Sequence, residues 1–180
     1  MKLSSLILTT AVLLTACHRK TETAEELLKE AAKTPGVNVG HGNYTITAPE
    51  GWTEFDTTFS GIKITFVQSV EPVGQFYPSV NVVTASTKLD LDAYEDDNLN
   101  AMEQKIGGYK FLDKGAGQLQ GHGVRWIRFQ SAVNGILMDD KAYDLVSEGV
   151  GYVITCTAGR GYFNRSAAAF DTIVNSFTLK

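Results

Sequence analysis

The sequence predicts an α+β domain in which helices cover an antiparallel β-sheet. Three observations predict it: β-branched runs recur between residues 44 and 158, short turn signals separate them, and two segments carry a single apolar stripe at helical spacing. Strands joined by hairpins pair antiparallel, and a helix with one apolar face buries that face against such a sheet.

Three strands are expected in the first half of this region. Residues 44–48 (YTITA) alternate between polar and apolar side chains and end at a Pro-Glu-Gly turn. Residues 61–70 and 79–87 are β-branched runs, and two prolines and a glycine separate them.

An amphipathic helix is predicted to begin after Asp90 or Asp92 and to end at Gly107-Gly108. Aspartate is a favoured N-cap, and acidic residues in the first turn complement the helix dipole. At about 100° per residue, one face collects the apolar side chains of Leu91, Tyr94, Leu99, Met102 and Ile106.

Further strands and a closing helix are expected in the second half. Residues 124–133 and 136–146 flank Asn134-Gly135, a pair that tolerates the positive φ of a type I′ hairpin turn, and 150–158 follows. We interpret 115–123 (GAGQLQGHG) as a turn and not as a phosphate loop, because a strand follows it where the loop needs a helix. The closing helix carries a stripe of Phe163, Ala167, Phe170, Ile173, Val174 and Phe177.

The N-terminus has the order of a secretory signal. Lys2 precedes an apolar stretch that is shorter than the roughly 20 residues of a membrane-spanning helix. The residues Leu14-Thr15-Ala16-Cys17 resemble the lipobox of bacterial lipoproteins, in which the cysteine is acylated and becomes the first residue. We therefore expect a signal peptide over 1–16 and lipidation of Cys17; the alternative is an ordinary signal peptide with a chance cysteine.

The anchor predicts where the protein resides. Several acyl chains on Cys17 would hold the protein stably on a membrane, facing the periplasm of the bacterial envelope. His18, where an aspartate would retain a lipoprotein in the inner membrane, favours the outer membrane. Residues 17–43 are expected to be a tether with a transient helix, or alternatively a segment that docks onto the domain, and 44–180 are expected to form the domain.

The charge balance argues against nucleic-acid partners. The chain has 16 basic and 20 acidic residues, a net charge of −4, and no basic stretch that could follow a phosphate backbone. With Cys17 lipidated, only Cys156 remains, so no intramolecular disulfide is expected. We interpret Cys156 as a buried, unreactive side chain.

No stretch of the sequence carries a recognisable catalytic constellation. His122 is the only histidine beyond residue 43, and no histidine or cysteine has metal-ligand spacing. The acidic run around Glu95 lacks the pattern of a calcium loop and is explained by the start of a helix, and Asp139-Asp140 is expected on the hairpin surface. We therefore expect no enzyme activity, no metal and no cofactor.

One pair of residues is a candidate for a protein interface. Trp126 and Arg128 are two positions apart on a predicted strand and so point to the same face, whereas Arg125 points to the other. Aromatic residues and arginine are enriched in interfaces. The alternative is a solvated sheet face that a helix partly covers.

Several segments, in this order, resemble the DcrB-type bacterial lipoproteins: YTITAPEGW, SVNVVTASTKLDLDAY, GHGVRWIRF and GYVITCTAGRGYFNRSAAAFDTIVNSF. That family shares a fold with the photosystem protein PsbP and with a yeast nuclear-import factor that binds Ran. The resemblance covers residues 44–180. It implies an α/β/α sandwich in which the antiparallel sheet packs between helices, and it implies no catalytic residues.

The expected function is binding at the cell envelope. The family resemblance implies envelope lipoproteins, assembly factors and, in cytosolic members, chaperones for apolar helices. We expect a membrane-anchored lipoprotein with a non-enzymatic binding or assembly role and an unidentified protein partner. The alternatives are a holdase for apolar segments of other proteins, and an enzyme or metal-dependent module that uses His122.

Overall fold

The computed structural model describes residues 44–59 and 62–180. Its main sheet consists of β2 (Trp52–Phe59), β3 (Ile62–Ser69), β4 (Ser79–Ser86), β5 (Lys110–Leu119), β6 (His122–Val133), β7 (Ile136–Ser147) and β8 (Val150–Gly159). These seven strands lie in the order β2-β3-β4-β8-β7-β6-β5, and every pair is antiparallel. A short strand β1 (Tyr44–Thr45) pairs separately with β9 (Thr178–Leu179).

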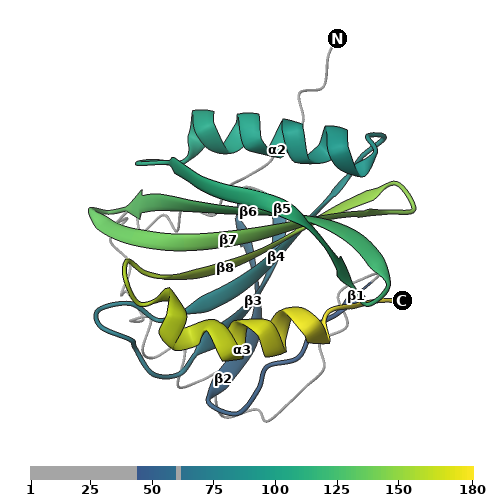
Figure 1. Ribbon diagram of the computed structural model, residues 1–180. Helices are drawn as coiled ribbons and strands as arrows, with labels where there is room; N and C mark the ends of the chain where they lie inside the picture. The colour runs from purple at the N-terminus through teal and green to yellow at the C-terminus, as the bar shows by residue number, and fades with distance from the viewer. Residues whose placement is uncertain (1–43, 60–61) are drawn as a thin grey trace.

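Two helices cover opposite faces of the sheet. Helix α2 (Leu91–Lys105) contacts β6 and β7, and α3 (Phe163–Ser176) contacts β4 and β8 from the other side (Figure 1). This confirms the predicted α+β class, with the sheet packed between helices. None of the helices among the described residues has the length and apolarity that crossing a membrane requires.

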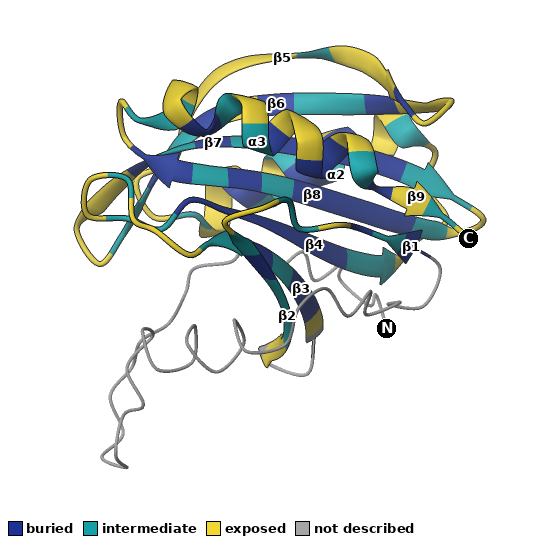
Figure 2. Ribbon diagram, turned by 90° about the horizontal axis from the view of Figure 1, so that it is seen from below, coloured by how far each residue is buried: buried dark blue, intermediate teal, exposed yellow. Residues whose placement is uncertain are grey.

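The two faces bury different cores. On the α3 face, Val80, Ile154 and Cys156 pack with the helix residues Phe170 and Ile173. On the α2 face a smaller cluster forms from Tyr94, Met102, Ile127, Phe129, Ala142 and Val153. Figure 2 shows the contrast between the central strand β8, buried along most of its length, and the edge strand β5, exposed along most of its length.

The local signals at turns and helix ends are confirmed. Asp90 caps α2, where its Oδ1 accepts a hydrogen bond from the backbone N–H of Ala93 at 2.9 Å. Asn134 and Gly135 have φ values of 52° and 81°, the left-handed backbone that a type I′ turn requires.

The strand prediction was wrong at both edges of the sheet. Residues 52–59 and 110–119 form β2 and β5, neither of which was predicted, and the turn expected over 115–123 is confined to Gln120-Gly121. Edge strands have one unpaired side and more solvent contact, so they need no regular alternation of apolar residues. At the N-terminal side, only two residues of the expected strand 44–48 pair as a strand.

A buried polar cluster attaches α2 to the sheet. Asn98 on the helix and Asp144 on β7 are each 0% exposed, and Asn98 Nδ2 donates a hydrogen bond to Asp144 Oδ1 at 2.8 Å. Glu95, one turn earlier, is also buried and pairs with Lys114 of β5 at 3.4 Å. The sequence explained Glu95 by the start of a helix, and the helix does begin at Leu91; helical spacing also places Glu95 on the face that packs against the sheet.

Burial changes the protonation of this cluster. Desolvation raises the pKa of Asp144 to about 7, although the hydrogen bond from Asn98 acts in the opposite direction. Asp144 Oδ2, Asn98 Oδ1 and Glu95 Oε1 are buried and have no hydrogen-bond partner among the described residues. The cluster therefore fixes the helix at one point and destabilises the fold when Asp144 is ionised.

Asp144→Asn should stabilise the protein at pH 8 by about 1–3 kcal/mol, with little effect at about pH 4. The unfolded carboxyl group has a pKa near 3.9, so between about pH 4 and pH 7 the folded state keeps a proton that the unfolded state has released. The free energy of unfolding of the wild-type protein therefore falls as pH rises through this window, and asparagine, which does not titrate, removes that contribution.

Urea denaturation at several pH values measures this difference. Asp171→Asn, which changes an exposed carboxylate on α3, is the control for the change in net charge. A stability difference between Asp144→Asn and wild type that stays constant from pH 4 to pH 8 would contradict the assignment.

Candidate ligand-binding pocket

A pocket of about 230 Å³ opens on the α2 face of the sheet, beside the helix. Adjacent strands β3, β4 and β8 supply its base, the β6–β7 hairpin supplies one wall, and the loop between β3 and β4 supplies Phe76. The described residues that line it are Phe66, Gln68, Phe76, Ser79, Asn81, Ser131, Val133, Asn134, Ile136, Met138, Asp140 and Thr157.

Asn81 is the central polar group of this pocket. It lies in the middle of β4, directly between Phe66 of β3 and Thr155 of β8, and it is 3% exposed. Its Oδ1 is buried and accepts no hydrogen bond from any described residue. Buried polar atoms in proteins nearly always have a partner, so an acceptor left open at the base of a pocket indicates a place for a ligand donor.

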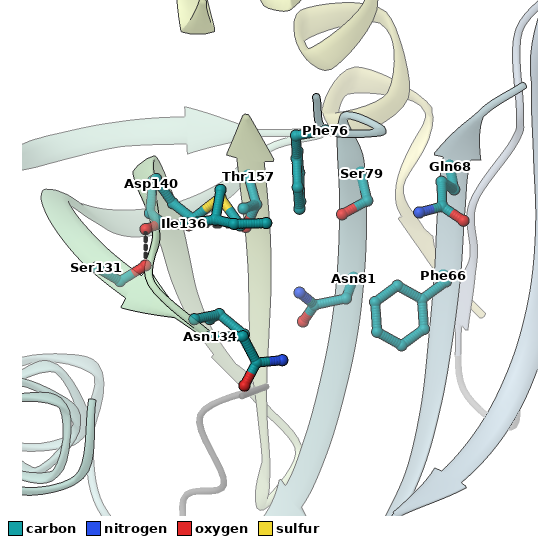
Figure 3. Close-up of a pocket in the computed structure, with 12 residues that line it drawn as sticks. Phe66, Gln68, Phe76, Ser79, Asn81, Ser131, Asn134, Ile136, Asp140 and Thr157 are labelled. Carbon is teal, nitrogen blue, oxygen red and sulfur yellow. Dashed lines mark hydrogen bonds between the residues drawn. The ribbon is translucent and has the colours of Figure 1, made fainter. Parts of the chain in front are cut away.

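Figure 3 shows that the side chains of Phe66, Asn81 and Asn134 converge on one hollow from two adjacent strands and the hairpin turn. Phe66 is held in place by stacking on Phe55, with ring centroids 5.5 Å apart. Phe76 is held by its loop, where Val73 N–H donates to the Phe76 carbonyl oxygen at 2.8 Å. The aromatic walls are therefore fixed by the fold.

Asp140 supplies the charge of the pocket. Ser131 Oγ donates to its Oδ2 at 2.7 Å (Figure 3). Thr157 Oγ1 donates to its Oδ1 at 2.7 Å. Desolvation raises the pKa of this carboxyl to about 6, and both hydroxyl hydrogen bonds limit the rise. At neutral pH, Asp140 is consequently still ionised for the most part.

Asp140 corrects an expectation from the sequence. Asp139 and Asp140 were both expected on the hairpin surface, but adjacent strand residues point to opposite faces. Asp140 is 5% exposed and faces the α2 side, whereas Asp139 accepts hydrogen bonds from Gly161 N–H at 2.7 Å and from Gln130 Nε2 at 3.0 Å.

The candidate interface residues lie on the other face of the sheet. Trp126 is half-buried and lies against Gly115 of the neighbouring strand, and Arg128 is exposed. The cation beside the indole is Lys141, whose Nζ lies 5.0 Å from the Trp126 ring centroid and 4.7 Å from that of Tyr143. The role of Trp126 and Arg128 in an interface stays a prediction.

The remaining residues singled out in the sequence are not part of the pocket. His122 is exposed at the start of β6, and Cys156 is buried on the α3 face, where burial raises the pKa of its thiol above the usual range. Cys17 lies outside the described residues. Within those residues, no group of three or more His, Cys, Asp or Glu side chains is placed to hold a metal ion.

Sequence reasoning missed the pocket, although one signal pointed to it. Asn81 interrupts the β-branched run SVNVV, and an amide in a strand that is otherwise buried needs a partner. Phe66 and Phe76 carried no such signal, because aromatic residues in strands and loops are usually packed into a core.

Comparison with solved structures identifies the fold, whereas comparison of the sequence alone finds no match. No family model matches the sequence, and no curated protein matches it either. Solved structures do match: LpqN of Mycobacterium tuberculosis, described as involved in cell envelope biogenesis, superposes with a TM-score of 0.59 and 14% identity, over 90% of this chain and 99% of LpqN.

Two further solved structures match the chain at similar levels. The cyanobacterial PsbP of Synechocystis has a TM-score of 0.55 and 13% identity, over 82% of this chain and 98% of its own. A point mutant of Mog1 has a TM-score of 0.52 and 12% identity, over 79% of this chain and 94% of Mog1. Identities this low establish the fold alone: the chain has the PsbP/Mog1-like fold.

Proposed function

We propose that the protein is a lipid-anchored lipoprotein of the bacterial envelope whose domain binds a ligand in the α2-face pocket and catalyses no reaction. The observation that carries the proposal is the buried acceptor Asn81 Oδ1, which has no hydrogen-bond partner among the described residues and belongs to a pocket that two phenylalanines also line. Such a site meets the requirements for binding: it is concave, mainly apolar, and has a few polar groups in fixed positions.

The chemistry of the lining supports binding over catalysis. The lining residues include no cysteine, histidine or lysine, and the serine and threonine that contact Asp140 donate to it. Activation of a serine or threonine as a nucleophile usually requires an adjacent general base, most often a histidine. The Ser131 and Thr157 hydroxyls have no histidine beside them among the lining residues. We infer a binding protein for this reason.

The envelope location rests on Cys17. The lipobox-like residues Leu14-Thr15-Ala16-Cys17 support lipidation, and His18 supports the outer membrane and a periplasmic domain. The fold shared with LpqN, whose description names cell envelope biogenesis, is in keeping with this location. We also propose, from the segments quoted above, that the protein is a DcrB-type lipoprotein.

Replacing Cys17 by serine should abolish incorporation of palmitate and release the protein from the membrane fraction, because the thiol is the atom that would be acylated. Metabolic labelling with an alkyne-tagged palmitate, followed by fractionation of the envelope, measures both effects. Cys156→Ser is the matched control and should keep the label, since that side chain is buried in the core. Equal labelling of the wild-type and Cys17→Ser proteins would contradict the anchor.

Asn81→Leu should prevent the protein from retaining a pocket ligand, because leucine has the same branched shape as asparagine but no acceptor. Native mass spectrometry of protein extracted from membranes in mild detergent measures the bound mass, with Arg128→Ala on the opposite face as the control. We expect a non-covalent adduct on wild type and on Arg128→Ala, and none on Asn81→Leu. An adduct that survives Asn81→Leu, or the absence of any adduct on wild type, would count against the pocket as the functional site.

A second candidate function is a holdase for apolar segments, and one observation favours it. Five large apolar side chains are exposed at the same end of the sheet as the pocket: Val70 at 40%, Phe111 at 46%, Leu112 at 39%, Ile136 at 40% and Leu137 at 47%. Exposed apolar patches mark sites where other molecules dock. Strand register places Phe111 level with Asp140 of the pocket, since Phe111 pairs with Phe129, which pairs with Asp140.

The holdase should suppress the aggregation of an apolar client, and Phe111→Ser with Leu137→Ser should weaken that suppression severalfold. Light scattering of a synthetic membrane-helix peptide, with and without the protein, measures the effect. Thr172→Ser, an exposed change on α3, is the control. Wild-type protein that leaves the scattering unchanged would exclude this second function and leave the first one intact.

A further inference from the structure

We propose that the α2-face pocket binds a small organic cation, a primary alkylammonium whose apolar part lies on the aromatic wall. This inference rests on the proposed function, since it names the ligand class of the same site. The geometry of three features points to it: the open acceptor, the charge of the lining and the aromatic rings.

The first feature is the need for a hydrogen-bond donor. Asn81 Oδ1 is buried at the base of the pocket with no donor among the described residues. The next pair along the same two strands is Gln68 and Ser79, which face each other across β3 and β4 and line the same hollow. An ammonium group carries three N–H donors and no acceptor, so it can supply the donor that Asn81 Oδ1 lacks.

The second feature is the sign of the charge. Among the described residues that line the pocket, Asp140 is the only ionisable one. An anionic ligand would meet this carboxylate with no lysine or arginine in the lining to offset the repulsion, whereas a cation would gain from it in a region of low dielectric. The carboxylate is fixed by Ser131 and Thr157, so its charge stays at a fixed place in the pocket wall.

The third feature is the aromatic wall. Phe66 and Phe76 line the hollow from β3 and from the loop that follows it, and the faces of such rings attract organic cations. Val133, Ile136 and Met138 of the hairpin add an apolar surface for a short carbon chain. The volume of about 230 Å³ lies below the about 300–1,000 Å³ typical of drug-sized ligands, which indicates one small molecule.

The test uses three probes of nearly equal size: n-butylamine, n-butanol and butyrate. Saturation-transfer NMR and titration at pH 7.5 are run on the lipidated protein extracted in one mild detergent, so that any uptake by micelles is common to all variants. We expect n-butylamine to bind at least tenfold more tightly than n-butanol, and butyrate to give no saturable binding.

Two neighbouring carboxylates provide matched variants. Asp140→Asn removes the charge inside the pocket and keeps an acceptor for a hydroxyl, and it should weaken n-butylamine at least fivefold while leaving n-butanol unchanged. Asp139→Asn removes one charge from the adjacent residue on the opposite face and should leave both affinities unchanged. Should Asp140→Asn fail to fold, as judged by its thermal melting, Asn81→Leu provides the second variant and should abolish n-butylamine binding.

The inference would be overturned by an affinity for n-butanol equal to or higher than that for n-butylamine, by a preference for butyrate, or by equal losses in the Asp140→Asn and Asp139→Asn proteins. A preference for the alcohol or the carboxylate would leave the pocket as a binding site and reject only the cation. If none of the three probes binds, the assignment of a cation as ligand is rejected. The proposed function is then decided separately, by the native mass spectrometry of membrane-extracted protein described above.

Discussion

The attachment of α2 to the sheet is the contact on which the rest of this structure depends. Asn98 donates to Asp144 in a region that excludes water completely, and one turn earlier the Tyr94 ring lies so close to Gly151 of β8 that a Cβ at this position would overlap it. These contacts hold the helix over β6 and β7. Because the helix lies there, the part of the same face formed by β3, β4 and β8 is left to the pocket.

The two faces of the sheet have accordingly different roles. The α3 face is closed by interlocking aromatic rings: Tyr44 stacks on Phe177 with centroids 5.2 Å apart, and Phe177 meets Tyr152 edge to face at 5.7 Å. Such packing buries apolar area, and the Tyr44 hydroxyl within it pairs with Thr65 Oγ1 at 2.7 Å. The α2 face instead carries amides, hydroxyls and carboxylates on the sheet itself. The larger apolar cluster is therefore on the α3 face, and the candidate pocket is on the other.

The first described strand, β1, packs on the α3 face of the sheet, where the Tyr44 hydroxyl lies 2.7 Å from Thr65 Oγ1, whereas the pocket is on the α2 face. The β6–β7 hairpin forms the pocket wall, whereas β1 pairs with β9 beyond the C-terminal end of α3 (Figure 1). In the proposed setting, the chain reaches the domain from the lipidated Cys17 through β1.

Local patterns in the sequence determined the parts of the fold that depend on neighbouring residues. Asp90 as a helix cap, Asn134-Gly135 as a hairpin turn and the apolar stripe of α3 were all predictable, because a cap, a turn and a stripe each follow from a few adjacent side chains.

Tertiary structure alone decided the edges of the sheet and the site. The strands β2 and β5 form because the neighbouring strands β3 and β6 supply their hydrogen bonds. Their own side chains show no pattern from which this pairing could be predicted. Asn81 and Asp140 line the pocket because α2 covers only part of the sheet face on which it lies, and these two residues are in the part that it leaves uncovered. Strand alternation predicts that two residues share a face, but only the position of the helix decides whether that part of the face is core or pocket.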